Sequence, residues 1–308
     1  MTSHIVTLAN GVKMPAFGLG TWQSGPNEVC KAVEYALKAG YRHIDTASIY
    51  GNEEEVGEGI KNAKIPRDEV FVTTKLWNSM HAPEDVPVAL DTSLKKLGLD
   101  YVDLYLMHYP CANDKAAFEK GENKSVDIDY VETYRAMEAL LDTGKVRAIG
   151  ISNFCQSELD RLLAAAKIVP AVHQMELHPY LKQETFLDYH KSHGIHVTAY
   201  SAFGNQNPSY ALAGEPRILE HPKVLEVAAS TEKTPAQILV AWAIQRGTSV
   251  IPKSVTPSRI DENIGGESLV LSPEDFEKVS TLGYSIRYSD FGPLVGYKYY
   301  SDLECPGK

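Results

Sequence analysis

Residues 40–54, GYRHIDTASIYGNEE, contain the run that decides the fold. The short apolar segment Tyr41–Asp45 predicts a strand, and the closing Gly-Asn pair is a turn signal. A carboxylate, Asp45, and a phenol, Tyr50, lie where this strand is expected to end. In an α/β barrel the chemistry is done at that end of the strands. Taken alone, such a tyrosine is more often a half-buried packing residue, so the rest of the chain must decide.

The same strand-then-helix pattern recurs along the chain. Apolar residues at helical spacing follow each short strand-like run, and in residues 27–39 the helix is stopped by Gly40. The predicted strands begin near residues 16, 41, 70, 102, 146, 171, 196 and 249. The predicted helices cover 27–39, 53–62, 84–97, 131–142, 156–166, 183–191, 222–231 and 235–246, with another beginning near Pro257. Repeated β/α units in 308 residues favour a closed (β/α)8 TIM barrel over a doubly wound sheet.

Segments outside this repeat are expected to sit at the ends of the barrel. Residues 5–8 and 12–14 flank Asn10-Gly11 and predict an N-terminal β-hairpin. The loops 111–129 and 201–221 are long, as binding loops or lids usually are.

The C-terminal tail, residues 284–308, is rich in Tyr, Gly and Pro and has no periodicity. We expect it to cover the active-site face of the barrel. The chain shows no linker and no low-complexity tract, so residues 1–308 are predicted to form a single domain.

Composition limits the classes of function. The formal charge of −10 argues against nucleic acid and anionic membranes as general partners. The sequence has no signal-peptide pattern and no apolar run near the ~20 residues of a membrane span. The four cysteines lack a CxxC pair, which favours reduced thiols over a disulfide frame or a metal site. We expect a cytoplasmic protein without metal, as a monomer or a weak dimer.

Four polar residues fall at or just beyond successive predicted strand ends. They are Asp45, Tyr50, Lys75 and His108. Singly, each has an ordinary structural explanation: a helix cap, a packing residue, a lysine reaching solvent, a core histidine. Together they are harder to dismiss, because a lysine that ends an apolar strand pointing inward needs a partner. Asp45 at the neighbouring strand end is the obvious one.

These four residues suit the protonation of an oxyanion formed when hydride adds to a carbonyl. A free tyrosine has a pKa near ~10, too high for ready acid catalysis at neutral pH, and a nearby ammonium is expected to lower it. Asp45 would keep Lys75 charged and oriented. His108 would donate a hydrogen bond to the carbonyl oxygen or assist proton transfer.

The hydride carrier has to be sought outside the usual glycine-rich motifs. No G-x-G-x-x-G follows a strand, and there is no P-loop. Instead, residues 250–263 leave the last strand and enter a helix, with Lys253, Ser254 and Arg259 near the helix N-terminus. Such helix ends bind phosphate in these barrels, and the two cations suit a 2′-phosphate. A solvated basic patch explains these residues about equally well.

Further strand ends carry amide and hydroxyl groups. Ser152 and Asn153 end the fifth strand, Gln174 lies in the sixth, and Tyr200 ends the seventh. Such groups can hold a carboxamide, and an aromatic face can stack on a nicotinamide. As isolated signals they are weak, because Ser and Asn are ordinary turn residues.

From about residue 5 to 283 the sequence resembles the aldo-keto reductase superfamily, in its NADPH-dependent aldose and aldehyde reductase branch. The matching stretches are GYRHIDTASIYGNEEEVG, TTKLWN, VDLYLMHYP, AIGISNF, HQMELHPYL, VTAYSAFG and IPKSVTPSRIDENI. The resemblance implies a (β/α)8 barrel that binds NADPH or NADP⁺ without a Rossmann motif. It also implies that Tyr50 is the proton donor, that Lys75 and Asp45 tune it, and that His108 orients the carbonyl.

The resemblance also assigns the binding residues. Those implied for the cofactor are Gly20, Thr21, Trp22, Asp45, Ser152, Asn153, Gln174, Tyr200, Ser201, Phe203, Asn205, Lys253, Ser254, Val255, Thr256, Arg259, Glu262 and Asn263. Those expected around the substrate are Trp22, Ile49, Trp77, His108 and Tyr109. Two positions depart from the family pattern. Asn207 stands where close relatives carry an Asp that latches a loop over the cofactor, and Tyr109 stands where Trp is common.

The leading hypothesis is an NADPH-dependent oxidoreductase that reduces small aldehydes, such as sugar aldehydes, uronates or glyceraldehyde, to alcohols. Lys115, Lys120 and Lys124 could meet a substrate carboxylate, or be plain solvated charges. Three alternatives stay open. They are an NADP⁺-dependent alcohol or polyol dehydrogenase, a nucleotide-binding regulatory subunit with little turnover, and a lyase or isomerase on the same barrel. The sequence names neither the physiological substrate nor the direction of the reaction.

Overall fold

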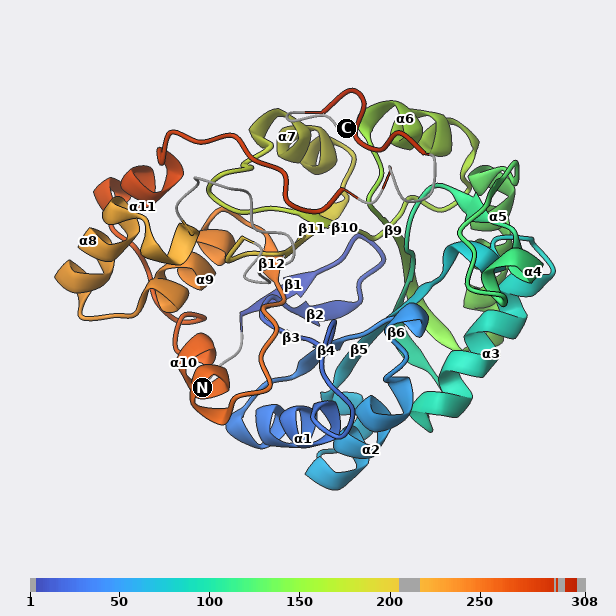
Figure 1. The fold of residues 1–308 in the computed structure, drawn as a ribbon, viewed down its shortest axis with the longest axis horizontal. Coiled ribbons are helices and arrows are strands. Elements are labelled where there is room, and N and C mark those ends of the chain that lie inside the picture. Colours follow the sequence, from blue (N-terminus) through green and yellow to red (C-terminus); the bar gives the residue numbers. More distant parts are fainter. Residues whose placement is uncertain (1–3, 205–216, 291, 293–296, 304–308) are drawn as a thin grey trace.

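The computed structural model describes residues 4–204, 217–290, 292 and 297–303. Its centre is an eight-stranded parallel sheet in the order β12-β11-β10-β9-β6-β5-β4-β3, ringed by helices (Figure 1). The strands are β3 Leu19–Gly20, β4 His43–Asp45, β5 Phe71–Leu76, β6 Val102–Met107, β9 Val146–Ser152, β10 Val172–Glu176, β11 His196–Tyr200 and β12 Ser249–Val250. All eight predicted strands are therefore confirmed.

The sheet closes on itself where its first and last strands meet. Parallel bridges join Phe17 to Val250 and Gly20 to Lys253. The Val250 N–H donates to Ala16 O at 2.7 Å, and the Gly18 N–H donates to Val250 O at 2.9 Å. A Cβ on Gly20 would lie 2.8 Å from the backbone oxygen of Ile251, so this seam accepts only glycine without shifting backbone. The predicted (β/α)8 barrel is confirmed.

Ten helices of eight or more residues surround the described strands. They are α1 Val29–Ala39, α2 Glu53–Ala63, α3 Asp85–Leu97, α5 Tyr130–Leu140, α6 Gln156–Ala165, α7 Glu184–Ser192, α8 Pro222–Thr231, α9 Pro235–Gln245, α10 Pro257–Ile264 and α11 Pro273–Ser280. Nine of them match the predicted ranges closely, and α11 was not predicted. No described helix is long and apolar enough to cross a membrane.

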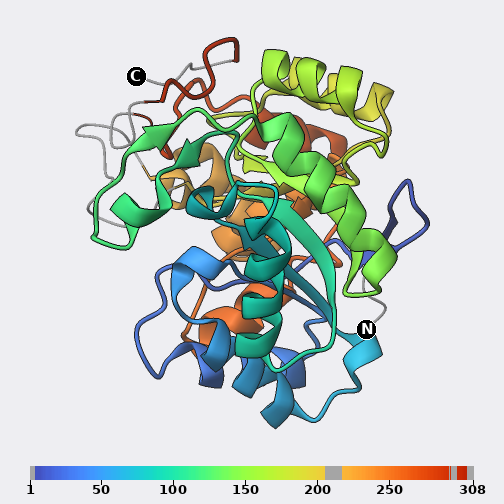
Figure 2. The same cartoon turned by 90° about the vertical axis from the view of Figure 1, so that its right-hand side faces the viewer.

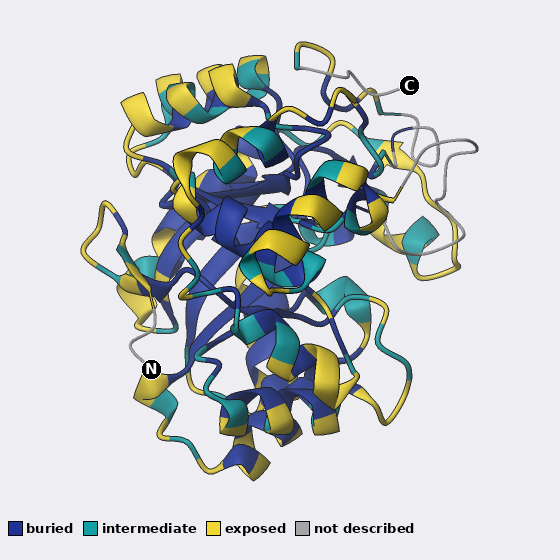
Figure 3. Cartoon of the chain, turned by 90° about the vertical axis from the view of Figure 1, so that its left-hand side faces the viewer, coloured by how far each residue is buried: buried dark blue, intermediate teal, exposed yellow. Residues whose placement is uncertain are grey.

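Burial follows the layered plan of the fold. The strands are buried along almost their whole length, while the helices expose only their outer faces (Figure 3). Helices α2 and α3 pack so closely that a Cβ on Gly57 would lie 2.1 Å from the backbone oxygen of Leu97. Because backbone cannot rotate away as a side chain can, this contact requires glycine.

The N-terminal hairpin plugs the end of the barrel that lies away from the predicted site. Strand β1 (Ile5–Thr7) pairs with β2 (Lys13–Pro15), and Gly11 in the turn has a φ of 82°. Leu8 and Met14 pack on buried residues of the barrel such as Phe71 and Val172. The hairpin lies over the centre of the ring in Figure 1 and on the side opposite segment 111–129 in Figure 2. The predicted hairpin is confirmed.

The segment 111–129 is more ordered than the sequence suggested. It contains a small antiparallel pair, β7 (Ala112–Asn113) and β8 (Ser125–Val126), and a one-turn helix, α4 (Lys115–Phe118). The expectation of a long loop without structure was wrong, because the hairpin strands are too short to produce a clear period in the sequence.

The described part of the C-terminal tail crosses the carboxyl ends of the strands. The Ile286 N–H donates to Tyr180 O at 2.8 Å. The N–H groups of Tyr288 and Ser289 each donate to the buried Glu176 carboxylate at 2.8 Å, at the end of β10. Figure 2 shows the tail at the same end of the molecule as segment 111–129.

Candidate active site

Tyr50 stands on a short turn that is tied to three strand ends. The 3₁₀ turn η1 (Ser48–Tyr50) directly follows β4, and its Ser48 hydroxyl donates to Lys75 O at 3.0 Å. Asn52, just beyond the turn, donates to Thr21 O at 2.9 Å and accepts from the Thr46 hydroxyl at 3.3 Å. These bonds hold the phenol over the carboxyl end of the barrel.

Asp45 and Lys75 form an ion pair inside the barrel. Lys75 Nζ lies 2.6 Å from Asp45 Oδ1, and the two side chains are only 1% and 3% exposed. The ammonium also donates to Thr46 O at 2.9 Å and to Tyr50 Oη at 3.4 Å. The second carboxylate oxygen of Asp45 accepts from Gln174 at 2.7 Å. The predicted pairing thus connects the phenol, the ammonium and the carboxylate in one chain of contacts.

The electrostatics of Tyr50 differ from the expectation. Burial, with the Asp45 carboxylate, raises the pKa of Tyr50 well above its ordinary value. Burial also lowers the pKa of Lys75, although Asp45 opposes that change. The predicted lowering of the Tyr50 pKa by Lys75 was therefore wrong for the protein alone, because desolvation of the phenolate outweighs the ammonium at 3.4 Å. Tyr50 remains a protonated phenol, ready to give up its proton only to a strong base.

His108 follows β6 and faces the same space. Its ring packs edge-on against Tyr50, with centroids 5.9 Å apart. Burial, the Lys75 charge and His81 lower the pKa of His108 well below its ordinary value. The imidazole is therefore neutral at physiological pH and can offer one N–H as a hydrogen-bond donor.

Aromatic side chains wall the space beside His108. The Tyr109 ring stacks on the His108 ring at 5.1 Å, and Trp77 packs edge-on against His108 at 5.2 Å. Phe118 of α4 lies 6.1 Å from Trp77, and Tyr299 of the tail lies 5.0 Å from Tyr109. Trp22 and Ile49 are half-buried. Phe118 and Tyr299 were not predicted, because neither lies in a periodic segment.

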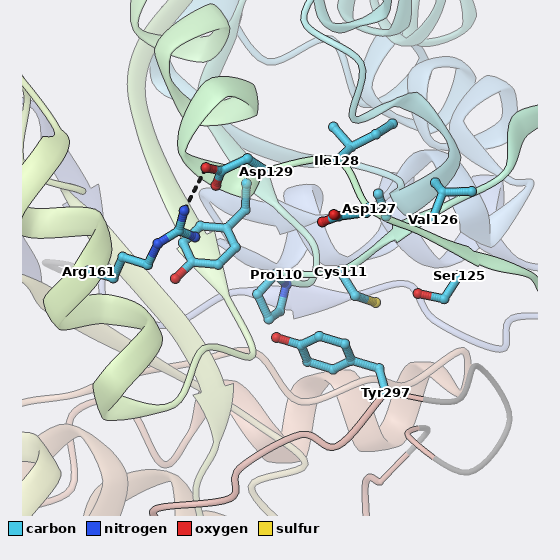
Figure 4. Close-up of a pocket in the computed structure, with 11 residues that line it drawn as sticks. Pro110, Cys111, Ser125, Val126, Asp127, Ile128, Asp129, Arg161 and Tyr297 are labelled. Carbon is cyan, nitrogen blue, oxygen red and sulfur yellow. Dashed lines mark hydrogen bonds and ion pairs between the residues drawn. The ribbon is translucent and has the colours of Figure 1, made fainter.

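A cavity of about 420 Å³ opens next to the aromatic wall, and no residue of the tetrad (Asp45, Tyr50, Lys75 and His108) lines it. It is lined by Pro110, Cys111, Ala112, Ser125, Val126, Asp127, Ile128, Asp129, Tyr130, Arg161 and Tyr297 (Figure 4). The Arg161–Asp129 ion pair, at 2.6 Å, borders one side. Tyr299 links cavity and wall, because its hydroxyl lies 2.8 Å from Cys111 Sγ while its ring packs on Tyr109.

The residues expected to hold a carboxamide also come together. Asn153 has a left-handed backbone, with a φ of 65°, just after β9. Its amide donates to Ser152 Oγ at 3.0 Å and accepts from Tyr200 Oη at 2.6 Å. Gln174 is instead bonded to Asp45, so it connects this group to the ion pair.

The expected phosphate residues surround the start of α10. Lys253 and Arg259 are exposed, and Ser254 accepts from the Thr256 N–H at 3.1 Å. Thr256 is the N-cap residue, and its side chain makes no capping bond. The helix begins at Pro257, which has no N–H, and the Arg259 N–H already donates to Thr256 O at 3.0 Å, so the charge of Lys253 and Arg259 is the main attraction for an anion here. Val255 and Glu262 are half-buried, and Asn263 is buried.

The remaining expected cofactor residues lie elsewhere on the same face. Thr21 donates to Asp45 O at 3.0 Å, Gly20 lies at the barrel seam, and Ser201 has a φ of 52° after β11. Phe203 is half-buried, while Asn205 and Asn207 lie outside the described residues. Lys115 pairs with Asp85 at 2.6 Å, while Lys120 and Lys124 are exposed.

Glu176 is a functional candidate that the sequence interpretation missed. It is a fully buried carboxylate that accepts from His178 Nε2 at 2.9 Å and from two N–H groups of the tail. Its signal was present, because it is a carboxylate at the end of a buried strand, as Asp45 is.

The site combines a phenol, an ammonium, a carboxylate and a neutral imidazole at the carboxyl end of a closed (β/α)8 barrel. This combination defines a class of barrel oxidoreductase. The model for the aldo/keto reductase family matches residues 16–283. An uncharacterized oxidoreductase of Schizosaccharomyces pombe is 51% identical over 290 residues, which are 92% of this chain and 89% of that protein. The chain belongs to the aldo/keto reductase family.

Two further comparisons agree in fold and length. Human aldo-keto reductase family 1 member A1 is 46% identical over 303 residues, which are 94% of this chain and 92% of that protein. The solved structure of the aldose reductase from Schistosoma japonicum matches with a TM-score of 0.88 and 37% identity. That match covers 96% of this chain and 98% of the other. The protein is therefore an oxidoreductase that acts on carbonyl compounds.

Proposed function

We propose that this protein is an NADPH-dependent reductase of small aldehydes, with Tyr50 as the proton donor. The proposed substrates are sugar aldehydes, uronates, glyceraldehyde or similar compounds. The single observation that carries the proposal is the contact of the Tyr50 hydroxyl with Lys75 Nζ at 3.4 Å, beside the neutral imidazole of His108.

The side chains around the site fit the cofactor. Lys253 and Arg259, exposed beside the N-terminus of α10, have the charge that a 2′-phosphate requires. Ser152 and Asn153 carry the hydroxyl and amide groups that can hold a carboxamide once a present partner is displaced, and Tyr200 carries an aromatic ring beside them. When bound, NADPH would supply the hydride. Without the 2′-phosphate, Lys253 and Arg259 would lose that anionic partner, so we propose a preference for NADPH over NADH.

The proton step follows from the chain's own groups. The neutral His108 would donate an N–H to the substrate carbonyl oxygen and hold it near Tyr50. As negative charge develops on that oxygen, the Tyr50 proton would move to it, and Lys75 would stabilise the phenolate left behind. Reduction uses the protonated phenol, and burial raises the pKa of Tyr50, so the phenol is in that form at neutral pH.

The proposal also covers the cellular location, the oligomeric state and the partners of the protein. We propose a cytoplasmic enzyme of carbohydrate metabolism that works as a monomer or weak dimer, without nucleic-acid or membrane partners. The overall charge of −10 supports the absence of those polyanionic partners.

The test is to assay the purified protein with a panel of aldehydes and NADPH, measuring the loss of NADPH absorbance. The corresponding alcohols are then assayed with NADP⁺ for the reverse reaction. Tyr50→Phe should lower turnover by about 10²–10⁴-fold while leaving NADPH affinity near the wild-type value. Tyr105→Phe is a matched control, because Tyr105 is a buried barrel tyrosine whose hydroxyl bonds no described residue. No turnover with any aldehyde, despite cofactor binding, would favour a nucleotide-binding regulatory subunit. Retained activity in Tyr50→Phe would remove Tyr50 from the donor role.

A further inference from the structure

The side-chain amide of Asn153 has no hydrogen-bonding capacity left over. Its Nδ2 donates to His108 O at 2.9 Å and to Ser152 Oγ at 3.0 Å. Its Oδ1 accepts from Tyr200 Oη at 2.6 Å and from Tyr300 Oη at 2.9 Å. A primary amide has two N–H donors and one oxygen with two lone pairs. Protein groups therefore use every one of these positions.

The orientation of this amide is determined by its partners. The His108 carbonyl can only accept, so Nδ2 must face it, and both phenols then reach the amide oxygen as donors. Asn153 and Tyr300 are each 2% exposed, so water does not readily replace either partner. A carboxamide that binds to Asn153 must displace a protein group.

Three of the four partners belong to the barrel, and the fourth belongs to the tail. Tyr300 lies in the described tail segment 297–303, which is held against the first turn of α6. The Asp302 carboxylate accepts from the Gln156 N–H at 3.2 Å and from the Ser157 N–H at 2.7 Å. The tail therefore docks beside α6, as Figure 1 also shows.

Tyr300 is the partner that is most easily released. Tyr200 belongs to β11, whose backbone is paired on both sides within the sheet. Tyr300, in contrast, has a φ of 56°, a left-handed conformation that is strained for a residue with a side chain. Its contacts with Asn153 and with the Arg287 guanidinium, 4.0 Å over its ring, hold it there. Releasing Tyr300 would relieve that strain.

We propose that the Tyr300 hydroxyl and the cofactor carboxamide compete for Oδ1 of Asn153. This inference rests on the proposed function, because it takes Asn153 to be a carboxamide ligand. Docking of the tail then weakens cofactor binding, and cofactor binding releases Tyr300, since coupling between two binding events is reciprocal. One hydrogen bond in competition corresponds to about a three- to tenfold change in affinity.

The affinity test uses two variants and a control. Tyr300→Phe removes the competing hydroxyl but keeps the ring, and it should tighten binding of NADP⁺ and NADPH about three- to tenfold. Asp302→Ala loosens the tail at α6 without touching Asn153, and it should change affinity in the same direction. Tyr105→Phe should leave affinity unchanged. Cofactor titrations followed by protein fluorescence give the three dissociation constants.

Hydrogen exchange of the wild-type protein provides a second measurement that needs no variant. Backbone amides of residues 297–303 should exchange faster when NADP⁺ is saturating. Unchanged or slower exchange there would overturn the proposal, as would equal or weaker cofactor binding by Tyr300→Phe. Wild-type protein that binds no NADP(H) at all would refute the proposed function itself. Normal binding without a Tyr300 effect would refute only this inference.

Discussion

Replacing Lys75 by methionine should destabilise the folded barrel by about 3–5 kcal/mol, because it leaves a buried carboxylate without its counter-ion. The Lys75 and Asp45 side chains are 1% and 3% exposed, and their charged atoms lie 2.6 Å apart. Methionine has a similar length and is apolar, so a cavity contributes little to the loss. In Lys75→Met, the Asp45 carboxylate keeps one side-chain donor among the described residues, the Gln174 amide at 2.7 Å. One neutral donor does not replace an ammonium.

The partner variant and the double variant test the same pair from the other side. Asp45→Asn should also destabilise strongly, because it leaves the Lys75 ammonium in the barrel interior. The double variant removes both charges, and its destabilisation should be smaller than the sum of the two single losses. The expected coupling is about 0.5–3 kcal/mol, because each single variant leaves an unpaired buried charge that the double variant does not contain.

Urea unfolding at neutral pH, followed by circular dichroism and tryptophan fluorescence, measures the four free energies of unfolding. Turnover should fall in both single variants and stay low in the double variant, because the double variant does not restore the Lys75 ammonium beside Tyr50. Single losses below about 1 kcal/mol, or additive losses in the double variant, would refute this account of the ion pair.

Two other predictions concern the tail and the helix packing. Burial alone would raise the pKa of Glu176, but hydrogen bonds and charge from His178, with help from Arg287 and the tail, lower it. Glu176 therefore stabilises the fold above its unfolded pKa of about 4.3, and that stability is lost as pH falls through the lower folded value. Thermal unfolding of Glu176→Gln should show a deficit at pH 7 that shrinks below about pH 4.3, and a constant deficit would contradict this sign. Gly57→Ala should destabilise by about 1–3 kcal/mol despite the ~1 kcal/mol gain in helix propensity, because its Cβ would meet backbone at 2.1 Å. Urea unfolding against the exposed control Glu58→Ala measures it, and a stabilised variant would show that the helices separate easily.

The barrel could be predicted from the sequence because its signals are local. Each strand is a short apolar run followed by a helix with a clear apolar face, and Gly40 and Gly98 end two of those helices in left-handed conformations. The tetrad side chains could be found because they stand at strand ends, and the parallel topology brings those ends together. The structure places Asp45, Tyr50, Lys75 and His108 in one group, while their roles remain predictions.

The parts that could not be predicted depend on contacts between distant segments. Tyr300 contacts Asn153, which lies 147 positions earlier in the sequence, and no pattern in the aperiodic tail predicts that contact. Phe118 meets Trp77 only because a hairpin too short to show a period folds segment 111–129 back. The direction of the Tyr50 pKa shift was also not predicted. It depends on how far burial of the phenol outweighs the nearby ammonium, and the sequence does not show how deeply a side chain is buried.

The seam of the barrel has a consequence for how the protein folds. The parallel bridge from Gly20 to Lys253 joins residues from nearly opposite ends of the chain, so it carries one of the largest loop-closure entropies in the fold. Lys253 also begins the segment proposed to hold the cofactor phosphate. A nucleotide that spans this seam would bind the closed barrel and not its open forms. It would thus act as a clasp, slowing the opening of the ring between its first and last strands.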